Sequence, residues 1–328
     1  MIRVPFSRVL SGRRWLEIAL DYRCNLRCLG CHACHDTGER LASSEALAWL
    51  RAGREAGIER LWLGGGEPTL RGDLVALVGA ARQIGYATIA VQSNGMRLAY
   101  PEYVAALLAA GVTEVRLNVK SHRSEIHDRL SGEDGCHALM LQALALLQKE
   151  GVRVLADVLL TRGTGEDLPE TVSFFAERGV AGFTLWLLSA ADSDDPAVSG
   201  AVPRIGDLVP HLSAACERAR ARGVSIESLH TPPCTLPADL RGLHRPAASL
   251  ALVVVDPTSR AFALETSSFE GGARVDACTL CSARERCGGP RADYLRIHGG
   301  SEFTALTPLG AKVPSSTSGS GHVGGEPG

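Results

Sequence analysis

Cysteine is the residue type in this sequence with the clearest capacity for chemistry. The chain holds ten cysteines, and seven of them fall into two tight groups, one near residue 30 and one near residue 280. Disulfides are rare where the thiol pool is reduced, and thiols that only pack in a core would be scattered along the chain. Clustered reduced cysteines indicate metal binding. The sequence therefore predicts two metal-binding segments.

The first group is the run Cys24-Asn-Leu-Arg-Cys28-Leu-Gly-Cys31-His-Ala-Cys34. Structural zinc and ordinary ferredoxin clusters take four protein ligands. Three thiolates, those of Cys24, Cys28 and Cys31, would instead leave one iron of a [4Fe–4S] cluster open to a non-protein ligand. We expect these three as ligands and Cys34 as a non-ligand. The alternative is a zinc knuckle that adds Cys34, or His32 or His35.

Six strands alternate with six helices along the chain. The first strand precedes the cysteine run, the other elements follow it, and together they must position it. The expected strands are Trp15–Asp21, Glu59–Gly64, Ala87–Ser93, Glu114–Lys120, Val152–Leu160 and Gly182–Leu188. The expected helices are Ser43–Gly57, Asp73–Ile84, Pro101–Ala110, Cys136–Glu150, Asp167–Arg178 and Asp207–Arg222. Such alternation predicts an α/β fold with a parallel sheet, either open or an incomplete barrel, whose chemistry lies where strands end and βα loops begin.

The remaining chain differs in composition. A short strand at Val224–Ser228 and a hairpin from Leu250–Val255 and Arg260–Glu265 are expected, in a region that holds four cysteines. The Ser- and Gly-rich end after Pro314 cannot bury a core. We expect an N-terminal segment at 1–14, a barrel at 15–225, a cysteine-rich extension at 226–305 and a disordered tail at 306–328.

Overall charge and hydropathy exclude several classes of function. The 328 residues carry 34 Lys and Arg against 36 Asp and Glu, so no strong field favours nucleic acid or anionic lipid. Apolar stretches are too short to span a bilayer, and the start of the chain lacks the pattern of a signal peptide. We therefore expect a cytoplasmic protein without a nucleic-acid or membrane partner.

The spacing of Cys24, Cys28 and Cys31 resembles the C-x3-C-x2-C signature of the radical S-adenosylmethionine (radical SAM) enzymes. Further motifs follow in the order typical of that family: Gly64-Gly65-Gly66-Glu67-Pro68 after the second strand and Gln92-Ser93-Asn94-Gly95 after the third. The resemblance covers about residues 15–225. It implies a (β/α)6 partial TIM barrel in which S-adenosylmethionine chelates the open iron of a [4Fe–4S] cluster.

The resemblance also implies which residues contact the cofactor. They are Gly65, Gly66, Glu67, Pro68, Ser93, Asn94, Asn118 and Lys120, with Ser121 beside them. The chain departs from the family at Gly30, where the residue before the third cysteine is usually aromatic. The segment His127–Gly132 and the helix after it resemble members that act on peptides and natural products.

The second group, Cys278-Thr-Leu-Cys281 and Cys287 with Cys234 upstream, resembles the SPASM and Twitch extensions of radical SAM enzymes. A shorter, Twitch-like form with one auxiliary [4Fe–4S] cluster fits four cysteines. Zinc held by the same four cysteines is the alternative. Tyr294 and Glu302 also fit the pattern of the extension.

Other residues carry weaker predictions. Cys136 and Cys216 are expected to be small buried packing residues. His122 and His127 are expected to lie on an exposed loop, and either could instead handle a proton. Asp157 and Trp186 lie on expected strands, and their register leaves open whether they face the barrel interior.

The resemblance implies an enzyme that cleaves S-adenosylmethionine reductively to a 5′-deoxyadenosyl radical, which abstracts hydrogen from a small natural product or a short peptide. It also implies an electron donor such as flavodoxin or ferredoxin. The competing class is a non-enzymatic iron–sulfur electron-transfer or zinc-binding protein, which would bind metal without cleaving the cofactor.

Overall fold

A nine-stranded, mostly parallel sheet forms the frame of the protein in the computed structural model, which describes residues 6–31, 38–267, 270 and 272–307. The strand order is β7-β6-β5-β4-β3-β2-β1-β8-β9, and only β9 runs antiparallel to its neighbour. The strands are β1 (Trp15–Ala19), β2 (Arg60–Gly64), β3 (Thr88–Ser93), β4 (Glu114–Val119), β5 (Arg153–Leu160), β6 (Gly182–Leu187), β7 (Ser225–Ser228), β8 (Leu252–Val255) and β9 (Ala261–Ala263).

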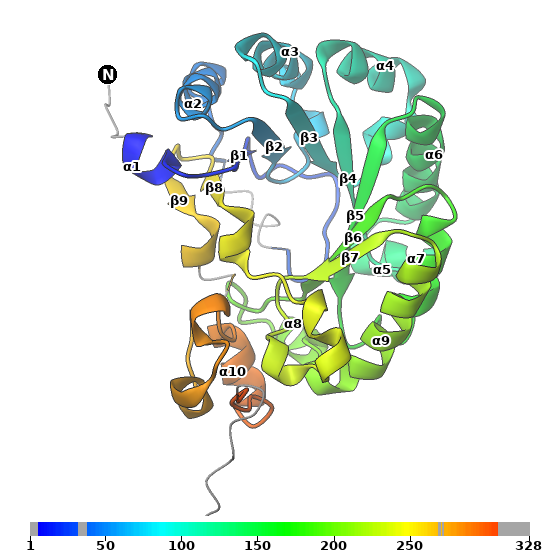
Figure 1. Cartoon of the computed structure of the whole chain (residues 1–328). Helices are drawn as coiled ribbons and strands as arrows, with labels where there is room; N and C mark the ends of the chain where they lie inside the picture. Colours follow the sequence, from blue (N-terminus) through cyan, green and yellow to red (C-terminus); the bar gives the residue numbers. More distant parts are fainter. Residues whose placement is uncertain (1–5, 32–37, 268–269, 271, 308–328) are drawn as a thin grey trace, which may run out of the picture.

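Helices lie on the outer face of the curved sheet (Figure 1). The helices are α1 (Phe6–Leu10), α2 (Ser43–Glu55), α3 (Leu74–Ile84), α4 (Pro101–Ala110), α5 (Ser124–Ser131), α6 (Cys136–Lys149), α7 (Leu168–Ala176), α8 (Pro196–Ala201), α9 (Ile205–Ala221) and α10 (Ala292–His298). The main core is apolar and lies between the helices and the sheet. Each strand gives one face to this core, and the alternate side chains are left for the interior of the barrel.

The partial barrel expected from the sequence is confirmed. Its sheet is not closed, because β7 and β9 are its two edges. The expected hairpin is present, and β8 joins the barrel sheet directly: Glu17 of β1 pairs in parallel with Val254 of β8. The sheet thus continues past residue 225. None of the described helices is long and apolar enough to cross a membrane.

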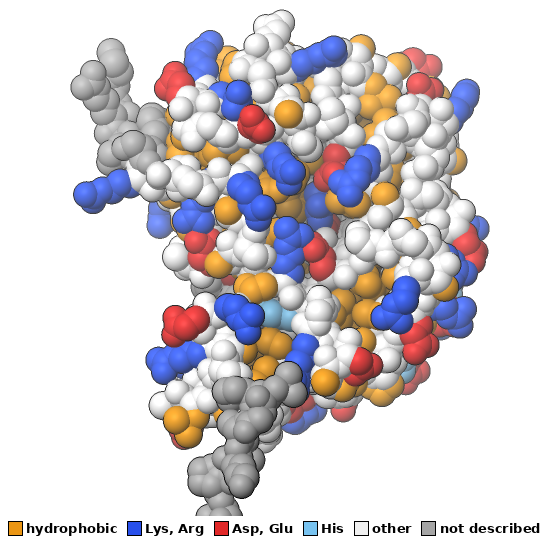
Figure 2. Space-filling view, viewed as in Figure 1, with side chains coloured by type: hydrophobic (Ala, Val, Ile, Leu, Met, Phe, Trp, Pro, Cys, Tyr) orange, Lys and Arg blue, Asp and Glu red, His pale blue; other side chains and the backbone are white. Residues whose placement is uncertain are grey.

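The amino ends of the strands surround a cavity of about 220 Å³. Four arginines line it, namely Arg60, Arg116, Arg153 and Arg245, together with Glu114 and Glu227. Basic side chains gather in the middle of the face drawn in Figure 2. The larger cavity lies at the opposite, carboxyl end of the strands and contains the candidate site.

Candidate active site

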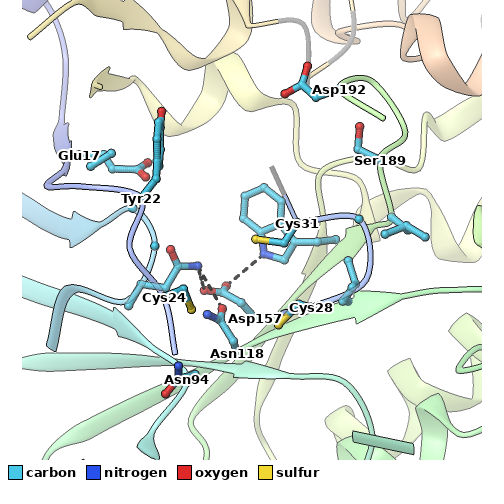
Figure 3. A pocket seen from close by; sticks show the side chains of 18 of the residues that line it. Glu17, Tyr22, Cys24, Cys28, Cys31, Asn94, Asn118, Asp157, Ser189 and Asp192 are labelled. Atoms are coloured by element: carbon cyan, nitrogen blue, oxygen red, sulfur yellow. Dashed lines mark hydrogen bonds between the residues drawn. The ribbon is translucent and has the colours of Figure 1, made fainter. Parts of the chain in front are cut away.

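One cavity of about 610 Å³ collects most of the side chains that the sequence singles out. Cys24, Cys28 and Cys31 lie on one of its walls (Figure 3). Of the residues expected to bind S-adenosylmethionine, six also line it: Gly65, Gly66, Glu67, Asn94, Asn118 and Lys120. Pro68 and Ser93 are buried beside the cavity and are not among its lining residues. Cys34, His32 and His35 lie outside the described residues.

The end of α5 fixes the position of the cysteine loop. The backbone N–H of Arg27 donates to the carbonyl of Ser131 at 3.0 Å, and that of Leu29 donates to the carbonyl of Leu130 at 3.0 Å. A Cβ added at Gly132 would lie 2.8 Å from the Arg27 carbonyl oxygen. The segment His127–Gly132 therefore packs against the cysteine loop and helps to fix its position.

The structure explains the glycine at position 30. Gly30 has a φ of +66°, a conformation that favours glycine, and a Cβ built there would lie 2.7 Å from Cδ1 of Leu188 and 3.1 Å from Cγ1 of Val198. An aromatic side chain has no room at this position. The loop that follows β6 fills the space instead.

Close contact between two loops requires the glycines after β2. The N–H of Gly66 donates to the Asp21 carbonyl at 2.8 Å, and the N–H of Glu67 donates to the Arg23 carbonyl at 2.7 Å. A Cβ on Gly66 would lie 2.2 Å from the Arg23 oxygen, and one on Gly65 would lie 2.4 Å from the Asp21 oxygen. The glycine loop therefore lies directly against the chain that leads into Cys24.

Replacing Gly66 with alanine should push these two loops apart. Because the steric conflict is with backbone, we expect a loss of about 1–3 kcal/mol of stability and weaker binding of S-adenosylmethionine. Equilibrium binding and thermal unfolding would measure the two effects. Gly72→Ala is the matched control, since a Cβ there meets nothing within 4 Å. Equal behaviour of the two variants would contradict the role of Gly66.

Glu67 ties the loop after β2 to the loop after β3. One carboxylate oxygen accepts hydrogen bonds from Oγ1 of Thr69 at 2.6 Å and from Oγ of Ser93 at 2.9 Å, and the other accepts from the N–H of Asn94 at 2.7 Å. Burial raises the pKa of Glu67, and these hydrogen bonds oppose the rise. Glu67 and Ser93 thus position Gly66 and Asn94 on the cavity wall.

The three loop thiols have the donor chemistry of an iron–sulfur site. Burial, together with smaller effects of the charges of Glu67, Cys28 and Cys31, raises the pKa of Cys24 to about 11. The N–H of Leu26, which donates to its sulfur at 3.4 Å, opposes this rise. Soft thiolate ligands suit zinc and iron–sulfur clusters. Among the described residues, no three His, Cys, Asp or Glu side chains are grouped closely enough to hold one metal ion.

The four cysteines of the second group also come together. Burial raises the pKa of Cys234 to about 11, and the charges of Cys287, Cys281 and Cys278 act on it in the same direction. Backbone N–H groups donate to two of the sulfurs: Gly289 to Cys287 at 3.3 Å and Leu306 to Cys281 at 3.5 Å. Cysteines separated by more than forty residues in sequence thus form one electrostatic group.

The C-terminal segment is docked on the barrel by buried polar contacts. Arg291 donates to the carbonyls of Leu187 at 2.8 Å and Leu188 at 2.6 Å, and Asp293 accepts from the N–H of Ala190 at 2.9 Å. Arg291 also lines the large cavity. The segment therefore completes the cavity wall and does not hang free from the barrel.

Tyr294 and Glu302 hold the start of α9. The N–H of Ile205 donates to the Tyr294 hydroxyl at 2.9 Å, and the N–H of Gly206 donates to Glu302 at 2.8 Å. Both N–H groups belong to the first turn of α9, where no carbonyl of the helix itself can accept from them. The Tyr294 hydroxyl also donates to Glu302. Both residues therefore attach the extension to the last barrel helix.

Comparison with known proteins agrees with this geometry. Residues 20–175 match the model of the Radical SAM superfamily. This chain contains a radical SAM domain. The matched range spans the cysteine loop, the glycine loop and strands β2 to β5. A domain of this family implies a [4Fe–4S] cluster and S-adenosylmethionine.

Relatives of the radical SAM domain include two kinds of cyclase. A probable GTP 3′,8-cyclase of Methanopyrus kandleri is 31% identical over 175 residues, which is 50% of this chain and 53% of that protein. A PqqA peptide cyclase of Ruegeria pomeroyi is 31% identical over 166 residues, 49% of this chain and 43% of that protein. The chain thus spans about half the length of these relatives.

Solved structures share the fold over most of the chain. Streptococcus suis SuiB bound to S-adenosylmethionine superposes with a TM-score of 0.67 at 15% identity, covering 90% of this chain and 77% of that one. Native anSMEcpe with bound AdoMet and Cp18Cys peptide gives a TM-score of 0.65 at 15% identity, covering 89% and 92%. At such identity the similarity establishes the fold alone.

A polar network in the radical SAM barrel includes residues that the sequence left undecided or missed. Asp157 and Trp186 both face the large cavity, and the indole N–H of Trp186 donates to Asp157 at 3.2 Å. Arg116, which sequence reasoning missed, binds Asp157 at 2.6 Å and lies 4.4 Å above the Trp62 ring. Gln92 donates to Asp157 at 3.1 Å. The only sequence signal for this network was that Arg116 and Asp157 are charged residues within largely apolar strands.

Glu17 of β1 is the second residue that sequence reasoning missed. It lines the cavity, and no described residue donates a hydrogen bond to its carboxylate. Burial raises its pKa to about 7, with Arg116 lowering the value and Asp157 and Glu270 raising it. An acidic residue in the apolar strand Trp15–Ala19 was the available signal.

The raised pKa of Glu17 predicts a pH-dependent stability. The folded protein holds the proton of Glu17 up to a higher pH than the unfolded chain does, because the pKa is raised from 4.5 to about 7. The free energy of unfolding is therefore fully maintained below about pH 4.5 and falls as the pH rises through 7. Ionisation of Glu17 should then lower the free energy of unfolding by about 3 kcal/mol. Glu17→Gln should therefore raise the unfolding temperature more at pH 8 than at pH 5.5. Glu55→Gln, on the exposed side of α2, should show no such difference. An equal shift at both pH values for Glu17→Gln would refute the assignment.

The expectation that His127 lies on an exposed loop is wrong. His127 is on α5, only 2% exposed, and its Nδ1 accepts from the N–H of Lys120 at 3.4 Å. Burial lowers its pKa to about 3, so it is neutral. His122 is partly buried and its ring contacts Thr171 at 3.1 Å. Neither is among the residues that line the described cavity.

Cys136 is buried and Cys216 is partly buried against the core, as expected.

Proposed function

We propose that this protein is a radical SAM enzyme in which Cys24, Cys28 and Cys31 hold a [4Fe–4S] cluster with one open iron. The observation that carries the proposal is the meeting of these three thiols with the loops after β2 and β3 on the walls of one cavity. When bound, the cluster and S-adenosylmethionine supply a 5′-deoxyadenosyl radical that takes a hydrogen atom from the substrate.

The residues of the barrel would bind and orient the cofactor. Small residues at Gly65 and Gly66 leave backbone polar groups accessible to the methionine amino group of S-adenosylmethionine. Asn118 and Lys120, at the end of β4, would contact its carboxylate or ribose. Glu67, Pro68 and Ser93 would shape the loops that carry these contacts, and Asn94 would border the cofactor from the third strand.

Cys234, Cys278, Cys281 and Cys287 would hold one auxiliary [4Fe–4S] cluster in a SPASM/Twitch-like extension. One feature is consistent with iron–sulfur here. Backbone N–H groups donate to the sulfurs of Cys281 and Cys287, a contact that tunes iron–sulfur clusters. With four ligands the cluster would be closed, as an electron relay or acceptor requires.

The substrate would be a short peptide or a small natural product. One relative is a PqqA peptide cyclase, others carry the name probable GTP 3′,8-cyclase, and SuiB has been solved bound to a precursor peptide, SuiA. The electron would come from a flavodoxin or ferredoxin. Reduced cysteine ligands favour a cytoplasmic location.

Reductive cleavage of the cofactor tests the proposal. Protein reconstituted anaerobically with iron and sulfide should release 5′-deoxyadenosine from S-adenosylmethionine when dithionite is added, and none without dithionite. Protein that binds about one zinc and releases no 5′-deoxyadenosine would instead be the non-enzymatic metal-binding protein.

A further inference from the structure

Among the described residues, Glu17 has no hydrogen-bond partner, which is unusual for a carboxylate in a barrel interior. No described residue donates a hydrogen bond to it, and the cation that lowers its pKa, Arg116, is already bound to Asp157 at 2.6 Å and to Thr184 at 2.9 Å. Glu17 is partly buried. A charge held away from water without a partner costs stability, and a ligand that supplies the partner would relieve that cost.

Neighbouring strands leave space and further unpaired polar groups at the same place. The indole N–H of Trp62, a residue only 7% exposed, has no hydrogen-bond acceptor among the described residues, and Trp62 lines the cavity. A Cβ built at Gly64 would lie 3.6 Å from Glu17 Oε1, 3.6 Å from Trp62 Nε1 and 3.4 Å from Gln92 Oε1. The missing side chain of Gly64 therefore leaves room where three polar atoms converge.

The rest of this side of the cavity is acidic. Asp192 and Asp256 line it with Glu17, and Figure 3 shows Glu17 and Asp192 on the walls above the cysteines. The cavity-lining cation on the extension, Arg291, is engaged by the Leu187 and Leu188 carbonyls and by Asp293. The other lining cation, Lys120, lies at the end of β4. Among the described lining residues, acidic side chains therefore outnumber Lys and Arg, and Arg116 acts on Glu17 from outside the lining.

We propose that Glu17 is a specificity-determining residue that binds a positively charged amine of the substrate, with Gln92 Oε1 as a second acceptor. The proposal rests on the proposed function, because it names the chemical class of substrate in the same cavity. A lysine side chain of a peptide and a small aliphatic amine share this chemistry. Charge-assisted hydrogen bonds from an ammonium group to a carboxylate are the strong ones.

The test is calorimetric binding to the reconstituted holoprotein with saturating S-adenosylmethionine and no reductant. The probe is Nα-acetyl-lysine amide, and Nα-acetyl-norleucine amide is its neutral match. The acetylated lysine amide should bind at least about tenfold more tightly than the acetylated norleucine amide, and Glu17→Gln should remove that difference in affinity. Below, the two probes are called lysine amide and norleucine amide. Glu55→Gln, on the outer helix α2, should preserve it.

Proton release gives a second readout that a merely structural role would not produce. Because the pKa of Glu17 is raised to about 7, part of the population holds this proton near neutral pH. Binding of a cation should therefore release a fraction of a proton, and the release should be absent in Glu17→Gln. Arg116, Asp157 and Glu270 are the charged groups that act on Glu17, and all three are retained in the variant.

Each outcome decides the proposal. Equal affinity of lysine amide and norleucine amide for the wild-type protein, or equal affinity of lysine amide for wild type and Glu17→Gln, would overturn it. Binding of n-butylammonium as tight as that of lysine amide would support a small amine as the source, and weaker binding would support a peptide. Because no cofactor cleavage is involved, failure here leaves the 5′-deoxyadenosine test of the proposed function unaffected.

Discussion

Protein with alanine at Cys24, Cys28 and Cys31 should release no 5′-deoxyadenosine and should retain only about half of the iron of the wild type. Two four-iron clusters give about eight irons per chain, and the variant should keep about four. The physical reason is that these thiols share one wall of the cavity and are expected to hold one cluster, while the second group of cysteines lies elsewhere. Iron analysis and chromatography of the nucleoside product measure both effects.

Cys216→Ala is the matched control for loss of a thiol. Cys216 lies on α9, partly buried against the core, and should affect neither iron content nor cofactor cleavage. Loss of all the iron in the triple variant, or no loss, would contradict the division of the cysteines into two sites.

Alanine at Cys278, Cys281 and Cys287 should have the complementary effect. These residues lie on the docked C-terminal segment, so the variant should lose the other half of the iron but keep the ability to cleave S-adenosylmethionine. Iron content and 5′-deoxyadenosine formation are again the measurements, taken on the same preparation.

The same variant separates iron from zinc in the second group. If the site holds zinc, the variant should lose about one zinc and no iron, and the auxiliary cluster would be excluded. Loss of cofactor cleavage together with the iron would show that the extension is needed for the first cluster.

The sequence was sufficient to predict the frame of the site because its signals are local. Alternation of apolar runs predicts every strand from β1 to β9 within two or three residues. The cysteine loop and the glycine loop are continuous motifs. Their meeting on one wall follows from parallel strands, whose carboxyl ends share an edge.

Features that depend on contacts distant in sequence could not be predicted. The parallel pairing of β8 with β1 joins residues more than two hundred positions apart, and a short apolar run does not specify its partner. The same holds for α5, whose sequence carries no long apolar stripe and whose role in holding Arg27 and Leu29 arises from the tertiary fold.

The inward direction of Glu17, Arg116 and Asp157 is also a tertiary property. A shift of register by one residue would place these side chains on the opposite face of the sheet. Only the paired strands show that the inward positions carry a connected polar network, with Arg116 between Asp157 and the Trp62 ring. Glu17 has no hydrogen-bond partner among the described residues of that network, and it is the residue that we propose for substrate recognition.

Electron–nuclear double resonance on the dithionite-reduced Cys278→Ala, Cys281→Ala, Cys287→Ala variant tests most directly whether the cofactor binds an open iron. The variant isolates the cluster expected at Cys24, Cys28 and Cys31. With S-adenosylmethionine labelled with ¹⁵N in its amino group and ¹⁷O in its carboxylate, the spectrum should show coupling of both labels to the cluster. Absence of coupling, with an electron resonance signal that is identical before and after addition of S-adenosylmethionine, would contradict the account.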